Sequence, residues 1–302
     1  MKVAITGAAG WLGRYVTEAL EADHDLILVD NVAPEDATIF DPTVAGRRRA
    51  APLVTRWPYH RTDVQDQAAL ATAFAGAEVV IHLAAWPTGD WELARSTMAT
   101  NMMGTFNVFE MGRTVGVRRI VNASSINAFG TFFWRVSGLT PVRRALPLAE
   151  DEPIVPEDPY SLSKAVTELI GATYARAFHV ETVNLRFAGV MAESVYQALL
   201  DEGLPATQAW ADHLYQWIHI RDVTQGIVKA ALAPVVIAEP ITLAAADTRA
   251  PEPTLELIRR FRPELQPHLR EPLPGRASLL SIARARTFLG YEPRFSLADA
   301  VK

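Results

Sequence analysis

The chain has 302 residues, 49% of them hydrophobic, and a formal net charge of −5. The length and hydrophobic share allow one large domain, or a main domain with a smaller partner, around a packed core; the net charge disfavours a nucleic-acid-binding protein. The chain contains no cysteine, which excludes disulfides, thiolate catalysis and cysteine-bound zinc and fits a reducing, cytoplasmic environment.

Short apolar runs alternate with helical patterns up to about residue 186. The expected strands are residues 3–5, 26–29, a weaker one near 59, 79–83, 119–121 and 182–185. The expected helices are residues 11–22, 66–74, 91–115 and 159–178. This alternation predicts an α/β fold with a parallel sheet covered on both faces, and ligands beyond the carboxyl ends of its strands. The first strand leaves no room for a signal peptide, and no apolar run reaches membrane-spanning length.

Beyond residue 186 the alternation weakens, and a smaller lobe is expected. Its predicted elements are helices over residues 194–211 and 221–231, a strand at 241–243, and helices near 254 and 279. No metal site is predicted, because the histidines show neither metal-ligand spacing nor a histidine–carboxylate cluster.

A glycine-rich turn links the first expected strand to the first expected helix. Gly7, Gly10 and Gly13 stand in this turn, and the second strand ends in Asp30. Strand, glycine turn, helix, strand and acid in this order form the pattern of a dinucleotide site. The glycines allow a tight turn, close approach of the pyrophosphate, and close packing of helix against strand. Asp30 is placed to accept hydrogen bonds from the adenosine ribose and would repel a 2′-phosphate, which favours NAD over NADP.

A phenol and an ammonium stand one helical turn apart, at Tyr160 and Lys164. Asp158 suits the N-cap of this helix and Pro159 its first position. A cation beside a tyrosine favours the phenolate and lowers its pKa from roughly 10, which makes the tyrosine a better base. The spacing alone equally fits a surface pair.

Taken together, the two motifs resemble the short-chain dehydrogenase/reductase superfamily, and more narrowly its extended branch of NAD-dependent sugar epimerases and dehydratases. The two residues between Gly7 and Gly10 depart from the usual dinucleotide pattern, which has one. Further matches are Asp63-Val64, His82-Leu83-Ala84-Ala85, Asn101-x-x-Gly104-Thr105, Val121 to Ser125 followed by Phe129-Gly130, Leu185-Arg186-Phe187 and Trp217 to Val223. The resemblance implies a Rossmann-type doubly wound parallel sheet, with residues 1–186 as the NAD-binding domain. Residues 187–302 are then mainly a small C-terminal substrate lobe, and strand elements of the first domain can recur near 217–245.

The resemblance also assigns site residues. Tyr160 is implied as the acid/base, Lys164 as the cation that lowers its pKa and holds the nicotinamide ribose, and Ser125 as the hydrogen-bond donor to the substrate oxygen. Ser125 is preferred to Ser124 by its register with Phe129-Gly130, and Asn101 is implied in a structural or proton-relay role. The cofactor contacts implied are Gly7, Gly10, Trp11, Leu12, Gly13, Asp30, Asn31, Asp63, Val64, Leu83, Ala84, Ala85, Asn101, Tyr160, Lys164 and Phe187. The substrate contacts implied are Thr88, Ser125, Asn127 and Tyr160.

Two departures from the family variants bear on the substrate. Ile126 and Asn127 stand where dehydratases of this kind carry an acidic pair, which disfavours a dehydratase. The segment 186–217 is shorter than the nucleotide-holding insertion of nucleotide-sugar epimerases, and in this the chain resembles uronate and aldose dehydrogenases. The prediction is an NAD-dependent oxidoreductase that transfers hydride between NAD and a sugar or sugar-acid carbinol through a Ser-Tyr-Lys site, and two alternatives stay open. Those alternatives are an NAD-dependent sugar epimerase with tightly held NAD and a non-catalytic NAD-binding sensor.

Several surface features leave alternatives open. The loop 131–157 contains Phe132, Phe133 and Trp134. It is expected either to cover the substrate or to form a packing or oligomer contact. Arg47, Arg48 and Arg49 are a solvated run or a phosphate contact. Arg143, Arg144 and Arg221 neutralise a substrate carboxylate or are ordinary surface arginines. Trp86 and Trp91 line the pocket or pack elsewhere. A homodimer is implied by the resemblance, through the helices at 91–115 and 159–178.

Overall fold

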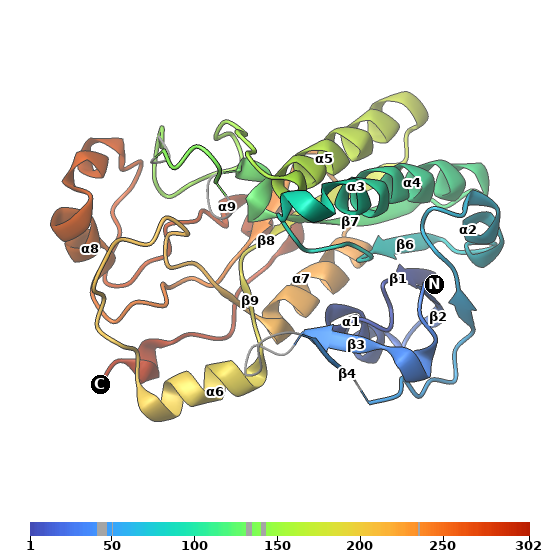
Figure 1. Ribbon diagram of the computed structural model, residues 1–302, viewed down its shortest axis with the longest axis horizontal. Helices are drawn as coiled ribbons and strands as arrows, with labels where there is room; N and C mark the ends of the chain where they lie inside the picture. Colours follow the sequence, from blue (N-terminus) through green and yellow to red (C-terminus); the bar gives the residue numbers. More distant parts are fainter. Residues whose placement is uncertain (41–46, 50, 131–134, 140–142, 235) are drawn as a thin grey trace.

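The computed structural model describes residues 1–40, 47–49, 51–130, 135–139, 143–234 and 236–302. Its centre is a parallel seven-stranded sheet in the order β11-β8-β7-β6-β1-β2-β5 (Figure 1). These strands are β1 (Lys2–Thr6), β2 (Asp25–Asp30), β5 (Tyr59–Arg61), β6 (Val79–His82), β7 (Arg119–Ser125), β8 (Glu181–Phe187) and β11 (Ile241–Leu243). The order reverses between β1 and β6, and the carboxyl ends of strands at such a switch point form the ligand crevice of doubly wound sheets. The Rossmann-type α/β fold predicted from the sequence is confirmed.

Helices cover both faces of the sheet, as the apolar strand sequences predict. On one face α1 (Trp11–Leu20) packs against α7 (Ile220–Leu232), and α9 (Ala283–Leu289) contacts α7 and β11. On the other face α4 (Gly104–Thr114) contacts both α2 (Gln67–Ala73) and α5 (Pro159–Phe178) (Figure 1). The strands between these layers are therefore apolar and buried along most of their length, from Val79 to Ile81 in β6 for example.

The single helix predicted over residues 91–115 is divided in the structure. A 3₁₀ turn η2 (Trp91–Leu93) leads into α3 (Ala94–Met98), a π-helical turn η3 (Ala99–Met103) follows, and then α4 begins. Just after the π turn the helix passes very close to Val64, since a Cβ on Gly104 would lie 2.4 Å from Val64 Cγ2. Within the π turn lies Asn101, whose side chain is buried. Turns of this kind are frequent at functional sites, and the apolar pattern does not reveal them.

The span after residue 186 contributes to the sheet as well as to a separate lobe. β9 (Val190–Met191) pairs with β10 (Ile218–His219), and the lobe also contains α6 (Glu193–Glu202), α8 (Thr254–Phe261), η5 (Pro263–His268) and η6 (Ala298–Ala300). β11 and α7 from this span join the main sheet and its covering layer. The remaining short elements are η1 (Pro34–Asp36), η4 (Ile126–Phe129) and the antiparallel pair β3 (Thr38–Phe40) and β4 (Arg47–Arg49).

Two helix predictions in this span were wrong in extent. The helix expected over 194–211 ends at Glu202, because Gly203 follows with a φ of +90° and Pro205 comes two residues later. The helix expected near 279 begins at Ala283 instead, after the buried pair Leu279 and Leu280. In both cases the apolar residues that suggested a longer helix pack from an irregular segment.

Candidate active site

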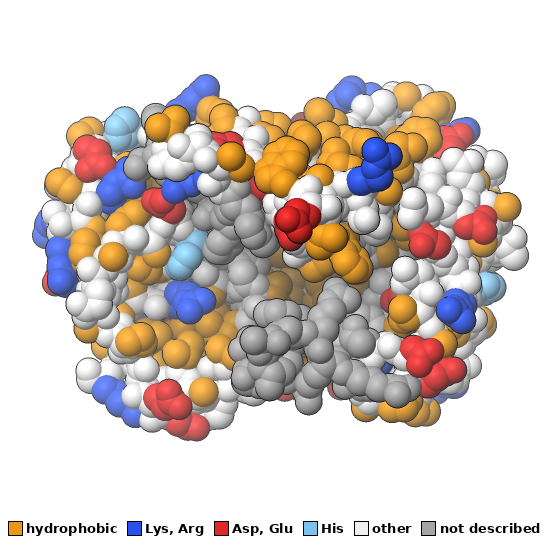
Figure 2. All heavy atoms as spheres, viewed as in Figure 1, with side chains coloured by type: hydrophobic (Ala, Val, Ile, Leu, Met, Phe, Trp, Pro, Cys, Tyr) orange, Lys and Arg blue, Asp and Glu red, His pale blue; other side chains and the backbone are white. Residues whose placement is uncertain are grey.

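A cleft of about 680 Å³ opens beyond the carboxyl ends of β1, β2 and β6. Figure 2 shows this face of the molecule hollowed near its middle. Most of the predicted cofactor residues line the cleft, namely Gly7, Gly10, Trp11, Leu12, Gly13, Asp30, Asn31, Asp63, Val64, Leu83, Ala84 and Ala85. The structure therefore brings together, at the switch point of the sheet, residues from four separate strand ends.

The glycine turn is shaped by the absence of side chains. Gly7 has a φ of +73°, and a Cβ on it would lie 2.8 Å from the backbone nitrogen of Ala84. A Cβ on Gly13 would lie 2.2 Å from the carbonyl oxygen of Gly7, so the missing side chain lets α1 approach the turn closely, and α1 also contacts β1. At Gly10 a Cβ would meet only the Gly7 oxygen, at 3.1 Å. The first turn of α1 thus faces the cleft with backbone N–H groups, the arrangement that binds a pyrophosphate.

Asp30 ends β2 and is held beside the glycine turn. Its Oδ2 accepts a hydrogen bond from the backbone nitrogen of Ala9 at 3.0 Å, and its Oδ1 accepts one from Val32 at 3.4 Å. Burial raises the pKa of this carboxyl, while backbone N–H groups, that of Ala9 foremost, lower it. Each carboxylate oxygen has a second lone pair, so the side chain can still accept hydrogen bonds from a ribose.

Sequence reasoning did not assign several residues that line the cleft, namely Thr6, Ala9, Thr62, Gln65, Pro87, Arg95, Ser96, Ala99 and Thr100. Trp86, which was considered for the pocket, lines it as well. Arg95 is the only lysine or arginine among the described lining residues. Nothing in its sequence neighbourhood distinguishes it, because its position depends on where α3 crosses the cleft.

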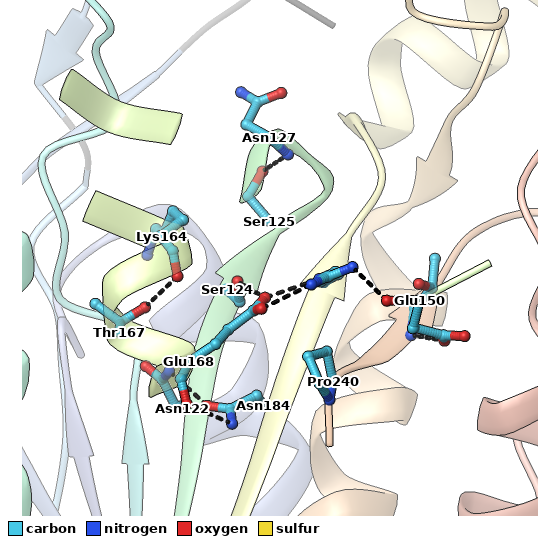
Figure 3. Close-up of polar contacts among 12 residues, drawn as sticks. Asn122, Ser124, Ser125, Asn127, Glu150, Lys164, Thr167, Glu168, Asn184 and Pro240 are labelled. Carbon is cyan, nitrogen blue, oxygen red and sulfur yellow. Dashed lines mark hydrogen bonds and ion pairs between the residues drawn. The ribbon is translucent and has the colours of Figure 1, made fainter. Parts of the chain in front are cut away.

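The catalytic candidates meet at the carboxyl end of β7. The Ser125 side chain hydrogen-bonds the Tyr160 hydroxyl and also accepts a hydrogen bond from the backbone nitrogen of Asn127, at 3.1 Å. Lys164 is buried, donates from Nζ to the carbonyl oxygen of Ala123 at 2.6 Å, and lies 5.7 Å from the centroid of the Tyr160 ring. Ser124 points elsewhere and donates to Glu168 (Figure 3). Alternation along the strand thus separates the two serines.

The pKa values in this cluster differ from the sequence expectation. Burial raises the pKa of Tyr160 to about 12; the hydrogen bond from Ser125 opposes this, and Asp158 adds to it. Burial lowers the pKa of Lys164 to about 8, and the charge of Glu168 opposes that shift. In the protein alone, desolvation therefore outweighs the effects that lower the tyrosine pKa, and the lowering expected from Lys164 stays a prediction.

Asn101 joins the loop after β6 to α5. Its Oδ1 accepts from the backbone nitrogen of Trp86 at 2.6 Å, and its Nδ2 donates to the Trp86 oxygen at 3.1 Å and to Ser163 Oγ at 3.0 Å. Ser163 Oγ in turn donates to the backbone oxygen of Tyr160 at 2.8 Å. These contacts fit the structural role for Asn101 among the two roles considered.

His82 forms a second buried link in this region. Its Nδ1 pairs with Thr6 Oγ1 at 2.7 Å and its Nε2 with Thr105 Oγ1 at 3.0 Å. Thr105 Oγ1 donates to the backbone oxygen of Asn101 at 2.5 Å. Burial, with a smaller contribution from Lys164, lowers the pKa of His82 to about 3, so the ring is neutral at ordinary pH.

The start of α5 is as predicted. Asp158 caps α5, with its Oδ1 accepting from the backbone nitrogen of Ser161 at 2.8 Å, and Pro159 is the first helical residue. This fixes the first turn of the helix, which carries Tyr160.

The remaining predicted contacts occupy different places. Phe187 pairs with Ser125 across β8 and β7. Asn127 is buried, and its Oδ1 has no hydrogen-bond partner among the described residues. Thr88 lies in the loop after β6, where its Oγ1 accepts from the backbone nitrogen of Asp90 at 3.2 Å. The cleft described above does not include Asn101, Ser125, Tyr160, Lys164 or Phe187 among its lining residues, so these form a neighbouring group.

The arginines considered for a carboxylate are dispersed. Arg221 forms an exposed ion pair with Glu193. Arg143 is buried, donates to the carbonyl oxygen of Asp212 at 3.2 Å, and burial lowers its pKa to about 10. Arg144 is exposed.

The aromatic candidates divide in the same way. Trp86 lines the cleft, whereas Trp91 is 59% exposed. Phe132, Phe133 and Trp134 lie outside the described residues, as do the side chains of Arg47, Arg48 and Arg49. Within the described part of the chain, no three His, Asp or Glu side chains are grouped so as to hold a metal ion. In that same part, no helix combines the length and the apolar character needed to cross a membrane.

Comparison with known proteins places these features in a family. The model of the NAD dependent epimerase/dehydratase family matches residues 3–245. L-arabinose 1-dehydrogenase (NAD(P)(+)) from Haloferax volcanii is 30% identical over 241 residues, which cover 76% of this chain and 82% of that protein. UDP-glucose 4-epimerase from Mycolicibacterium smegmatis is 25% identical over 325 aligned positions, covering 100% of this chain and 96% of that one.

Solved structures agree with the fold. A short-chain dehydrogenase/reductase superfamily protein from Agrobacterium tumefaciens, crystallised with bound NAD, superimposes with a TM-score of 0.71. The two share 21% sequence identity, and the match covers 100% of this chain and 95% of the other.

Proposed function

The chain belongs to the NAD dependent epimerase/dehydratase family, and from this premise we propose that it is a dehydrogenase of a free sugar or sugar acid. It is an NAD-dependent enzyme of the short-chain dehydrogenase/reductase type. The observation that carries the proposal is the hydrogen bond between Ser125 and the Tyr160 hydroxyl, with Lys164 one helical turn further along α5. That arrangement is a proton-transfer device, and it lies next to the cleft lined by the glycine turn.

The cleft residues fit NAD. Gly10 leaves room above the first turn of α1 for a pyrophosphate, and Asp30 ends β2 where an adenosine ribose would lie. When bound, NAD supplies the acceptor for a hydride from the substrate carbon. A carboxylate at Asp30 would repel the 2′-phosphate of NADP, which supports NAD as the cofactor.

The protein's own residues would handle the proton. Ser125 would hold the substrate hydroxyl oxygen within reach of Tyr160, and Tyr160 would take the hydroxyl proton. With a pKa of about 12, Tyr160 needs nearby positive charge to lose its proton at neutral pH, and Lys164 is the cation that the chain places beside it. Asn101 would keep the loop after β6 and the start of α5 in fixed relation.

Three observations support a small, sugar-like substrate. The buried Oδ1 of Asn127 has no partner among the described residues, and a substrate hydroxyl could donate to it. The short segment between β8 and β10 contributes α6 as its only described helix, which leaves a compact lobe. The relative named above that acts on L-arabinose has the higher identity of the two.

An epimerase remains the second candidate. The mycobacterial UDP-glucose 4-epimerase aligns along the whole chain, including the lobe after residue 245. An epimerase oxidises and re-reduces the same substrate, so it would use Ser125, Tyr160 and Lys164 in the same roles without releasing NADH.

The experiment is an assay of NADH absorbance with purified protein, NAD and a panel of free aldoses, uronates and nucleotide sugars. NADH formation with a free sugar or uronate, lost in Tyr160→Phe, is the expected result. Absence of NADH with every compound, combined with isomer interconversion of a nucleotide sugar, would replace the dehydrogenase by the epimerase. Activity retained by Tyr160→Phe would overturn both.

We also propose a homodimer and a cytoplasmic location. Exposed apolar side chains on η3, α4 and α5 support the dimer: Met103, Phe106, Leu162, Leu169 and Phe178. Sedimentation analysis of the native chain and of Leu169→Glu would test it, with a monomer expected only for the variant. The division into an NAD-binding domain over residues 1–186 and mainly a substrate lobe over 187–302 is likewise a proposal.

A further inference from the structure

Glu168 continues the spacing of the catalytic helix. It lies four residues after Lys164, as Lys164 lies four residues after Tyr160, so the three share one face of α5. The Glu168 side chain is 8% exposed. Its Oε1 accepts from Arg186 Nε at 2.8 Å and from Ser124 Oγ at 2.6 Å, and its Oε2 accepts from Arg186 Nη2 at 2.8 Å (Figure 3). The carboxylate is therefore fixed in position by three hydrogen bonds.

Stability alone does not account for this ion pair. Arg186 is 3% exposed, and burying both charges costs desolvation energy that commonly equals or exceeds their attraction. Apolar residues of similar volume would fill the same space at no such cost. Glu168 follows Lys164 by one turn of α5. Lys164 is itself buried, and its ammonium donates to the uncharged Ala123 backbone oxygen.

We propose that Glu168, held by Arg186 and Ser124, is a positioning residue that keeps the Lys164 ammonium charged beside Tyr160. The inference rests on the proposed function, in which Lys164 acts as the cation of the site. The charge of Glu168 opposes the lowering of the Lys164 pKa by burial. Without it, Lys164 and Arg186 would be two buried cations in one region, and Lys164 is the one that can lose its proton.

Several other charged or titratable groups stand on the elements that pack against α5. They are Arg119 on β7, Glu181 and Arg186 on β8, Glu110 and Arg113 on α4, and Arg95 on α3, with Asp158 and Tyr160 at the start of α5 itself. His82 on β6 interacts electrostatically with Lys164, and Arg119 is paired with Glu181. His82 is neutral at ordinary pH, and Glu110 is paired with Arg113. Glu168 is the carboxylate whose charge acts on Lys164.

The pair is anchored beyond the helix. Arg186 Nη1 donates to the backbone oxygen of Glu150 at 3.4 Å, and Glu150 Oε1 accepts from the backbone nitrogen of Thr242 in β11 at 2.7 Å (Figure 3). We therefore expect Arg186 to stay in place when Glu168 is altered and to be left with an uncompensated charge.

The test is a pH titration of the lysine side chains by NMR, with ¹³C at the ε-carbon. The other lysines of the chain are Lys2, Lys229 and Lys302, so Lys164 is assigned by its absence in Lys164→Met. The native midpoint is expected at about 8. In Glu168→Gln we expect the midpoint to fall by about one unit or more, whereas Glu168→Asp retains the charge and should fall less. Ser124→Ala removes one hydrogen bond but neither charge, and should leave the midpoint within a few tenths of a unit.

A second variant guards against misfolding. Glu168→Gln with Arg186→Met removes both charges, and its Lys164 midpoint is expected between the native and the Glu168→Gln values. An unchanged midpoint in every folded variant that lacks the Glu168 charge would overturn the proposal, as would a shift of equal size in Ser124→Ala.

The titration needs no substrate, so it separates this inference from the proposed reaction. If the midpoint shifts but no compound yields NADH or an isomer, the positioning role holds and the proposed function fails. If an active compound is found, the alkaline limb of kcat/KM should move to lower pH in Glu168→Gln by the same amount as the NMR midpoint. A limb that stays in place while the midpoint moves would show that Lys164 ionisation does not govern the reaction, and would overturn the catalytic part of the inference.

Discussion

The glycine turn and the end of β7 build the two halves of the site in opposite ways. At residues 7–13 the geometry depends on missing side chains, since a Cβ at Gly7 or Gly13 would meet backbone at 2.8 or 2.2 Å. At the end of β7 it depends on side-chain contacts between segments far apart, such as Ser125 with Tyr160 and Asn101 with Ser163. The first half should fail through folding and cofactor binding, and the second through the chemical step.

Ser125→Ala should give the largest effect. The chain keeps its fold and its NAD affinity, but the substrate oxygen loses its hydrogen-bond donor beside Tyr160, and kcat/KM should fall at least about 100-fold. Steady-state kinetics on the substrate found by the NADH assay, with NAD affinity from calorimetry, would check this. A comparable loss of NAD affinity would erase the contrast between the two halves.

Gly13→Ala should act through stability. Its Cβ would lie 2.2 Å from the Gly7 oxygen and 2.8 Å from Ala8 Cα, so backbone must move, and the free energy of unfolding should fall by about 1–3 kcal/mol. Gly10→Ala is the matched control, because its Cβ would meet only one atom, at 3.1 Å. The Gly10→Ala variant should have nearly the same urea midpoint of unfolding as the native protein. Equal destabilisation of both variants would contradict the packing argument.

His82 joins the two halves through Thr6 and Thr105, and its substitution should change the pH dependence of stability. Its pKa is lowered to about 3 in the folded chain, against about 6.5 when unfolded. The stabilisation that the neutral His82 ring gives to the folded chain is therefore fully present above pH 6.5, and it is lost as the pH falls toward 3. Between pH 7 and 5 the native chain should lose about 2 kcal/mol more than His82→Gln in urea unfolding. If both proteins lost the same unfolding free energy between pH 7 and 5, His82 would take up its proton in the folded chain as readily as in the unfolded chain.

Asp158→Ala should have the smallest effect on stability but a distinct one on activity. Loss of an N-cap costs about 1 kcal/mol, and the same is expected for Asp66→Ala at the start of α2. Only the Asp158 variant loosens the turn that carries Tyr160, so only it should also lower kcat. Thermal melts and kinetics on both variants would test this, and equal activity would show that the cap does not position the tyrosine.

The contrast between a turn shaped by backbone and a cluster held by side-chain contacts also explains which features the sequence could predict. Where backbone geometry forms the site, short stretches of consecutive residues determine it. The glycine turn, Asp30 and the helix cap at Asp158 could therefore be predicted from the sequence. Strand alternation was enough to separate Ser124 from Ser125, since the rule needs only the strand itself. Six strands of the sheet followed from the apolar runs for the same reason, whereas β11 was expected in the smaller lobe and joins the main sheet instead.

Features that depend on contacts between distant segments could not be predicted from the sequence. Arg95 faces the cleft only because α3 crosses it, and the π turn around Asn101 accompanies the close approach of Gly104 to Val64. The raised pKa of Tyr160 follows from how much protein surrounds it, which no spacing reveals. The position of Glu168, four residues after Lys164, is visible in the sequence. Its ion pair with Arg186 of β8 is seen only in the structure.

The place of β11 has a consequence for how the chain is made. β8 is complete at residue 187, but its outer neighbour in the sheet is not synthesised until residues 241–243. During that interval on the ribosome the growing sheet ends in an open edge of unpaired backbone groups, the kind of edge that recruits other strands. A fragment ending at residue 186 would keep that edge permanently, and would be expected to aggregate rather than to serve as a free-standing nucleotide-binding module.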